Sequence, residues 1–345
     1  MVAKHIRYGF VVSTGEAGVA KGFRGFELFE KAGILKYLKR SERIENSRDL
    51  GPASTPDGSL SRRRFLRMGV GILAGTGAAS AGYGAFIERK HLIVRRVEIP
   101  LERLPEAWDG LMIAQLSDLH YHPYWSADVI QHAIEVTNSL KPDVIALTGD
   151  YVTVPFRNRS PRKLAWEIEP CTALLRVLSA RLGVFAVLGN HDAESRPNHI
   201  SEVLGTAGIR VLRNAAFPLE RNGRRVWMVG LEDALYGNQD LGVALKQVPA
   251  SETSIALVHE PDYADEVSRS PVDLQLSGHS HGGQIRVPVV MPLYLPYMAR
   301  KYPIGLYTVG RMKLYTNSGL GTIRVPIRLF APPEVTLFAL RVKKG

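Results

Sequence analysis

Residues 111–120 read Leu-Met-Ile-Ala-Gln-Leu-Ser-Asp-Leu-His, a short buried-strand pattern followed at once by an aspartate and a histidine. The same arrangement recurs four more times along the chain, each time with a residue that can bind a metal or move a proton. The five groups are Asp118-Leu119-His120, Gly149-Asp150, Gly189-Asn190-His191-Asp192, His259 and Gly278-His279-Ser280-His281. Because parallel strands in an α/β sheet direct their carboxyl ends to a common crevice, we expect these groups to converge.

The chain around these groups alternates short apolar runs with helical periods, which predicts an α/β fold. We expect buried strands at 111–116, 143–148, 184–188, 254–258 and 274–277, and further strands at 306–309, 314–316 and 335–342. A helix is expected over 126–140, and a second from Pro170 toward Gly183. Asn222-Gly223 predicts a hairpin turn between strands at 211–219 and 226–229, because both residues tolerate positive φ.

The ligand chemistry of the five groups excludes sulfur. The only cysteine, Cys171, lies inside a helical apolar pattern and is expected in the core. Residues two apart on an extended segment face the same way, so D-x-H and H-x-H spacings let two side chains share one ion. A set of histidine, aspartate and asparagine this large suits two first-row divalent ions better than one tetrahedral zinc, with a carboxylate bridging them.

The segments S-D-L-H, G-D-Y, G-N-H-D, V-H-E and G-H-S-H-G-G-Q resemble the signature of the calcineurin-like metallophosphoesterases, over about Glu98 to Glu334. The resemblance implies a four-layer α/β/β/α sandwich of two mixed sheets, with a binuclear metal site at the carboxyl ends of strands. One ion would be held by Asp118, His120, Asp150 and His281, and the other by Asp150, Asn190, His259 and His279. His191 would lie beside the substrate phosphate, protonating the leaving oxygen or stabilising charge, with Asp192 orienting it.

The chemistry that this resemblance implies is hydrolysis of phosphoester bonds. Two divalent ions, of manganese, iron or zinc, would lower the pKa of a shared water from 15.7 to about 7 and supply a hydroxide nucleophile. We expect a phosphodiester substrate, with a lipid headgroup as one candidate. The alternative is a lipid-linked pyrophosphatase of the UDP-2,3-diacylglucosamine hydrolase type, which acts in lipid A synthesis. A metal-binding protein without catalysis is a third reading.

Charge is concentrated near the N-terminus. The 345 residues carry 44 Lys and Arg against 33 Asp and Glu, a net charge of +11. Residues 1–67 hold 14 basic and 7 acidic side chains, so most of the excess lies there. The remainder is only mildly basic, and we expect no nucleic-acid partner.

Residues 61–87 resemble a twin-arginine export signal. Ser61-Arg62-Arg63-Arg64-Phe65-Leu66-Arg67 is followed by twenty uncharged residues, 68–87, rich in glycine and alanine. We expect the twin-arginine export machinery as a partner and a periplasmic or other extracytoplasmic location. Either the signal is cleaved near Ala79 and Ala81 or 68–87 tethers the protein to the membrane. The expected organisation is therefore a poorly ordered arm and linker at 1–60, the signal or anchor at 61–87, and the catalytic domain at 88–345.

The segment 285–309 follows the last expected ligand and is strongly apolar, with four tyrosines and four prolines. Either it forms a wall or lid that accepts a lipid tail or contacts a bilayer, with Arg300 and Lys301 near phosphates, or it is an ordinary strand and packed loop.

Overall fold

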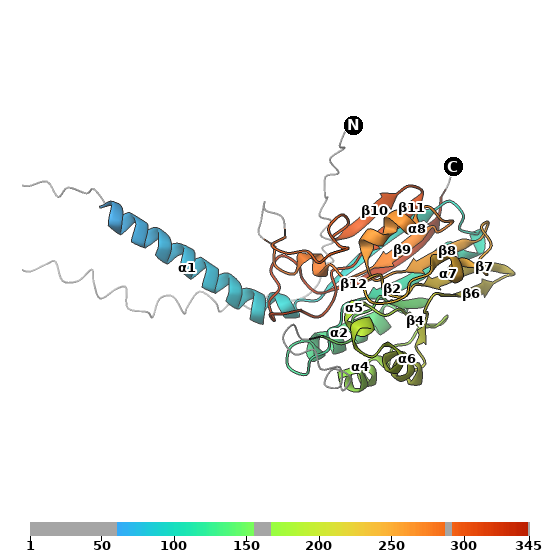
Figure 1. The fold of residues 1–345 in the computed structure, drawn as a ribbon, viewed down its shortest axis with the longest axis horizontal. Helices are drawn as coiled ribbons and strands as arrows, with labels where there is room; N and C mark the ends of the chain where they lie inside the picture. The colour runs from blue at the N-terminus through green and yellow to red at the C-terminus, as the bar shows by residue number, and fades with distance from the viewer. Residues whose placement is uncertain (1–60, 155–166, 287–291, 344–345) are drawn as a thin grey trace, which may run out of the picture. The chain divides into compact units, whose positions relative to one another are not determined.

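The computed structural model describes residues 61–154, 167–286 and 292–343 (Figure 1). Its helices are α1 (Arg62–Phe86), α2 (Ala127–Ser139), α4 (Ile168–Leu175), α5 (Asn190–Ser195), α6 (Pro197–Thr206), α7 (Leu241–Leu245) and α8 (Ala264–Val267). Its strands are β1 (Ile93–Leu101), β2 (Met112–Leu116), β3 (Val144–Leu147), β4 (Val184–Ala186), β5 (Arg210–Val211), β6 (Ala215–Arg221), β7 (Arg224–Gly230), β8 (Thr253–Leu257), β9 (Leu274–Ser277), β10 (Gly305–Val309), β11 (Met312–Thr316) and β12 (Glu334–Val342).

These strands form two six-stranded sheets. The first has the order β1-β12-β2-β3-β4-β5, in which β2 to β5 are parallel and β12 runs antiparallel to β2. The second has the order β10-β11-β9-β8-β7-β6, with a parallel centre and an antiparallel strand at each edge. Both sheets are therefore mixed, as expected.

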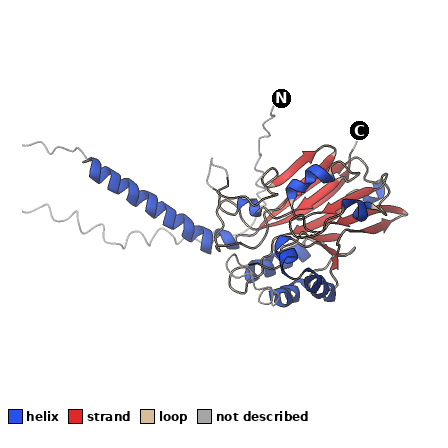
Figure 2. Cartoon of the chain, viewed as in Figure 1, coloured by secondary structure: helices blue, strands red, loops and turns tan. Residues whose placement is uncertain are grey.

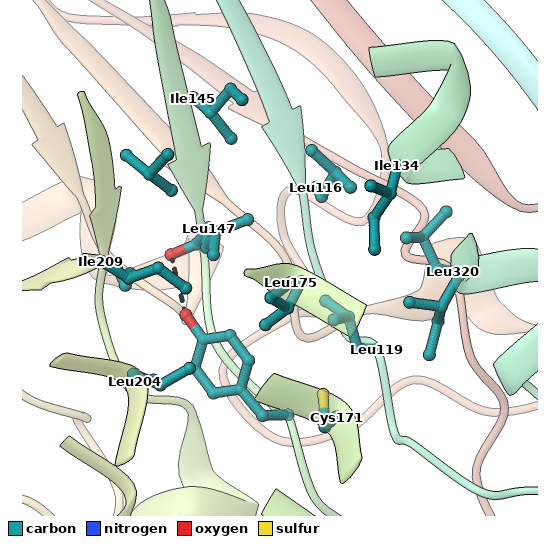
Figure 3. Packing of buried hydrophobic residues seen from close by; sticks show 14 of the residues in the cluster. Leu116, Leu119, Ile134, Ile145, Leu147, Cys171, Leu175, Leu204, Ile209 and Leu320 are labelled. Carbon is teal, nitrogen blue, oxygen red and sulfur yellow. Dashed lines mark hydrogen bonds between the residues drawn. The ribbon is translucent and has the colours of Figure 1, made fainter. Parts of the chain in front are cut away.

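Alternation of side chains along each strand separates the core into layers. In β3, Val144 and Ala146 pack between the two sheets, whereas Ile145 and Leu147 face the opposite side. There they meet buried side chains of α2, α4 and α6, and Cys171 is part of this cluster (Figure 3). The cysteine is core, as predicted.

The second sheet repeats this arrangement on its own outer face. Trp227 and Val229 of β7 pack with residues of α7 and α8, while Met228 points toward the first sheet. The layers are thus helix, sheet, sheet and helix, with strands at the centre and helices outside (Figure 2). The expected four-layer α/β/β/α sandwich is confirmed.

Two sequence-based boundaries were wrong. Val211 belongs to β5 in the first sheet, and a new strand, β6, begins at Ala215 in the second. The turn at Asn222-Gly223 is correctly placed, and both residues have positive φ. The second predicted helix, α4, starts at Ile168 and ends at Leu175, so Pro170 lies in its first turn, where a missing N–H is tolerated.

Helix α1 occupies most of the expected signal or anchor segment. Within the described residues, it is the one helix long and apolar enough to cross a membrane, by length and composition, with a mean hydropathy of 1.3. Its side chains are almost all exposed. A signal sequence would pass the same test. The arm and linker expected at 1–60 lie outside the described residues.

Candidate metal centre

The expected ligands lie just beyond the carboxyl ends of five parallel strands from both sheets. Asp118 and His120 follow β2, Asp150 follows β3, and Asn190 begins α5 after β4. From the second sheet, His259 follows β8, while His279 and His281 follow β9.

The first group of side chains is Asp118, His120 and His281, and all three are buried. The Nε2 atom of His281 lies 3.4 Å from Oδ1 of Asp118 and 3.1 Å from Nε2 of His120. Two ring nitrogens and a carboxylate oxygen thus point at one small volume. Such a set of donors suits a cation.

The second group is Asp150, His259 and His279, also buried. Oδ2 of Asp150 lies 3.2 Å from Nε2 of His259 and 3.4 Å from Nε2 of His120. The same carboxylate oxygen therefore faces a histidine of each group. Asp150 occupies the position that a bridging ligand needs.

Three of these histidines are oriented by the ring nitrogen that faces away from the centre. His259 donates from Nδ1 to the carbonyl oxygen of Thr148 (2.7 Å), and His279 donates from Nε2 to that of Tyr297 (2.8 Å). Because a carbonyl oxygen only accepts, the opposite nitrogen of each ring keeps its lone pair for a metal. Nδ1 of His120 lies 3.0 Å from the Thr153 hydroxyl, which leaves Nε2 facing the centre.

The residues present fit a pair of divalent cations. The side-chain oxygen of Asn190 is buried and lacks a hydrogen-bond partner, although such atoms are normally satisfied. Nε2 of His259 also lacks a partner with hydrogen-bond geometry despite its closeness to Asp150. Both atoms are of the kind that binds first-row divalent ions.

Burial and charge set the protonation states of several expected ligands. Burial lowers the pKa of His279 to about 4 and holds that of His281 well below its ordinary value, so both rings are neutral at pH 7. Burial opposes ionisation of Asp150, but His259 and His191 hold the pKa of that carboxyl well below its usual range. Neutral His279 and His281 and an ionised Asp150 are thus in metal-binding states. Burial opposes protonation of His259, but Asp150 holds its pKa well above the ordinary value, so a metal would have to displace a proton from that ring.

Backbone strain is concentrated at the same residues. Five expected ligands have positive φ, a region that few residues other than glycine adopt. These are Asp118 (49°), His120 (40°), Asp150 (58°), His279 (66°) and His281 (51°). Conformations of this kind cost on the order of 1–3 kcal/mol each and cluster at functional sites, so their repetition here points to a functional site.

Two glycines allow the ligand loops to approach each other. A Cβ atom on Gly189 would lie 2.3 Å from Oδ1 of Asp150, and one on Gly278 would lie 2.3 Å from Oδ2 of Asp118. Both contacts are shorter than van der Waals packing allows. Any side chain at either position would displace a carboxylate of the centre.

His191 lies beside this centre, with its ring 4.9 Å from that of His120. Its Nδ1 accepts a 2.9 Å hydrogen bond from the backbone N–H of Val154. An acceptor nitrogen carries no proton, so the ring is neutral with its proton on Nε2. Burial lowers its pKa to about 4, which agrees with that state.

Asp192 does not orient His191, contrary to expectation. Its carboxylate accepts hydrogen bonds from four backbone N–H groups, those of Asp150 (2.8 Å), Tyr151 (3.0 Å), Val152 (3.3 Å) and Gly189 (3.0 Å). The side chain is fully buried. It therefore fastens the loop after β3 to the loop after β4, and it positions Asp150 through the backbone.

Replacing Asp192 by alanine should lower the Tm of the metal-free full chain by about 10 °C, because four buried N–H groups lose an acceptor worth about 3 kcal/mol. Circular dichroism in mild detergent measures the change. Asp192→Asn keeps one acceptor oxygen and should lose less. A Tm unchanged by the alanine substitution would show that the loops are held by other contacts.

The apolar segment 285–309 contributes a backbone contact to the centre. Within its described part, Tyr297 supplies the carbonyl that orients His279. Lys301, expected near phosphates, pairs instead with Asp265 at 2.7 Å. The backbone N–H groups of Arg300 and Lys301 both donate to Asp262. Residues 287–291 lie outside the described residues.

Three known proteins show what this chain is similar to. An uncharacterized metallophosphoesterase of Bacillus subtilis, YkuE, is 35% identical over 287 residues, which cover 82% of this chain and 98% of that protein. Phosphodiesterase YaeI of Escherichia coli is 33% identical over 287 residues, covering 81% and 99%. The solved structure of Haemophilus influenzae NAD nucleotidase has a TM-score of 0.41 at 14% identity, covering 61% of this chain and 45% of that one.

The family profile that matches the chain is that of the calcineurin-like phosphoesterases, over residues 111–283, which contain every expected ligand. Such a match, together with relatives above 30% identity along nearly their whole length, identifies the fold and the class of reaction. The chain belongs to the calcineurin-like phosphoesterase family and is a metallophosphoesterase.

Proposed function

We propose that the protein hydrolyses phosphodiester bonds at a binuclear centre formed by Asp118, His120, Asp150, Asn190, His259, His279 and His281. The observation that supports this most is the position of Asp150, whose Oδ2 faces His120 on one side and His259 on the other. A bridging carboxylate is what two neighbouring cations require. The relative YaeI is itself described as a phosphodiesterase.

Two divalent cations bound there would act as Lewis acids and would lower the pKa of a bound water toward neutrality. The protein's own residues supply orientation. Backbone carbonyls fix His259 and His279, and Asp192 fixes the loop that carries Asp150. His191 presents Nε2–H, which can donate a hydrogen bond to a phosphoryl oxygen and stabilise the charge that develops on it.

We further propose that the substrate is a lipid-linked phosphodiester and that the protein is exported by the twin-arginine route and kept in the membrane by α1. The arginine motif occupies the first turns of α1, and the uncharged remainder of that helix is long and exposed. That helix continues without a break through Ala79 and Ala81 to Phe86. Cleavage would have to cut a formed helix, which supports a retained anchor. UDP-2,3-diacylglucosamine is the second candidate substrate, although nucleotide-linked lipids are made on the cytoplasmic face.

The test of activity is an assay of the full chain in detergent with Mn²⁺, Fe²⁺ or Zn²⁺. The panel holds bis-p-nitrophenyl phosphate, p-nitrophenyl phosphate, a phospholipid and UDP-2,3-diacylglucosamine, and Asp150→Ala is the blank. We expect hydrolysis of the diesters. An absence of hydrolysis above the blank with every metal would contradict the proposal. Cleavage of UDP-2,3-diacylglucosamine and of no other compound in the panel would favour the second candidate substrate.

The test of location is protease accessibility of the catalytic domain in spheroplasts. We expect the wild type to be degraded from outside and to stay with membranes after carbonate washing. Replacing Arg62 and Arg63 by lysine should leave the chain protected inside. Protection of the wild-type chain would contradict export. It would also make UDP-2,3-diacylglucosamine the preferred candidate substrate.

Removing bound metal should lower the thermal stability of the protein. A ligand at 100 times its Kd stabilises the folded state by about 2.7 kcal/mol per site, which corresponds to a Tm shift of about 5–10 °C. Differential scanning fluorimetry with and without EDTA measures the shift, and Mn²⁺ should restore it. Asp150→Ala serves as control because its Tm should not respond to metal. An identical Tm in EDTA and in Mn²⁺ would contradict a resident metal centre.

A further inference from the structure

Six large apolar side chains are exposed on three loops near the end of α1. They are Tyr124, Trp125, Leu293, Tyr294, Val325 and Phe330, which we name the collar. Tyr124 is 79% exposed, Leu293 66% and Phe330 57%. An aromatic-rich apolar patch of this kind on a folded domain usually marks an interaction surface.

Two of the three loops contact the last residues of α1 and the turn after it. The N–H of Arg328 donates to the carbonyl of Gly84 (3.2 Å), and the N–H of Ala331 donates to the buried carboxylate of Glu88 (2.8 Å). Arg89 is also buried, donates to the carbonyl of Trp125 and lies over its ring at 5.6 Å. These contacts fix Trp125 and the 325–330 loop beside the foot of the helix.

The third loop joins the second. The guanidinium of Arg324 lies 4.7 Å from the ring centre of Tyr294. The N–H of Leu293 donates to the carbonyl of Ile285. Arg286, which follows Ile285 in the chain, donates its backbone N–H to the carbonyl of Leu329 in the second loop. The three loops of the collar are therefore linked either to one another or to the point where α1 leaves the domain.

We infer that the collar docks on the lipid bilayer that α1 enters. The uncharged stretch 68–87 is long enough to cross the hydrocarbon core, about 30 Å at 1.5 Å per residue. It ends at Ile87, so the membrane boundary falls next to Glu88 and Arg89. These two residues bond the loops that contain Phe330 and Trp125 of the collar. Tyrosine and tryptophan prefer this interfacial depth.

The collar also borders the metal centre, which gives the docking a consequence for the substrate. Tyr297, three residues after Tyr294, supplies the carbonyl that orients His279. A phosphoester whose acyl chains stay in the bilayer would therefore reach the metal centre without leaving the membrane surface. This step rests on the proposed function, whereas the docking itself does not depend on catalysis.

Single cysteines test the collar in the full chain, because the native Cys171 is buried and does not take up label. Tyr124→Cys, Leu293→Cys and Phe330→Cys are labelled with a fluorophore and reconstituted into phosphatidylethanolamine and phosphatidylglycerol vesicles that contain a headgroup nitroxide lipid. Val177→Cys and Leu306→Cys are matched controls at exposed apolar positions. The carbonyl of Val177 accepts a hydrogen bond from Asn138, at the C-terminal end of α2. The N-terminal end of α2 lies near the foot of α1, because Asp128 there pairs with Lys90. Val177 is thus at the end of α2 that is farther from α1.

We expect quenching by the nitroxide lipid to be about threefold stronger at the collar labels than at the controls, because interfacial depth allows collision. Equal quenching at all positions would overturn the inference while leaving the anchor and the activity in place. Collar labels shielded from water but not quenched by lipid would indicate a second copy of the chain there and would also overturn it. Release of the protein by carbonate would overturn both the anchor and the docking, without bearing on hydrolysis.

Discussion

Replacing Asp150 by alanine is expected to remove both cations and, with them, phosphodiester hydrolysis. Its Oδ2 lies 3.4 Å from Nε2 of His120 and 3.2 Å from Nε2 of His259, so neither group of ligands is complete without it. Activity should fall to background, a loss on the order of 10⁶-fold or more.

Metal content by mass spectrometry and turnover of bis-p-nitrophenyl phosphate measure the two effects on the same sample. Asp143→Asn is the matched control, since Asp143 immediately precedes β3, whereas Asp150 lies beyond its other end. Its carboxylate bonds the N–H of Met112 and the side chain of Arg181, so the control should keep metal and activity. An Asp150→Ala protein that still binds two equivalents of metal would exclude the bridging role.

The ligands could be predicted because each combines two signals that sequence carries well. A buried strand is visible as an apolar run, and the residue that follows it is visible as a polar interruption. Asp118 after β2 and His279 after β9 are of this kind. Their convergence was predicted from the rule that parallel strands of one sheet direct their carboxyl ends to a common crevice. The strands in fact belong to two sheets, and only the family resemblance indicated the sandwich.

Contacts made by backbone atoms could not be predicted. The carbonyls of Thr148 and Tyr297 and the N–H of Val154 orient three histidines, and every residue type offers such groups. The role of Asp192 was wrong for a related reason. Adjacency to His191 suggested a side-chain pair, whereas the start of helix α5 turns the carboxylate toward the amides of the neighbouring loop.

Replacing His191 by alanine is expected to leave both cations bound and to slow hydrolysis by about 10²–10⁴-fold. Its Nδ1 is occupied by the N–H of Val154, so the ring can offer only Nε2–H to a substrate. It acts as a hydrogen-bond donor to developing charge. His199→Ala is a suitable control, since that histidine pairs with Glu169 on the surface and should tolerate the change.

The dependence on leaving group separates this role from full proton donation. A pKa near 4 means that the His191 ring is protonated only well below neutral pH, and protonation would break the bond from Val154. The loss in kcat should therefore be similar for p-nitrophenyl and alkyl esters, and His191→Gln, which keeps an N–H donor, should recover part of it. A loss that grows steeply with the pKa of the leaving alcohol would instead identify His191 as the general acid. Loss of metal from the alanine variant would make it a ligand.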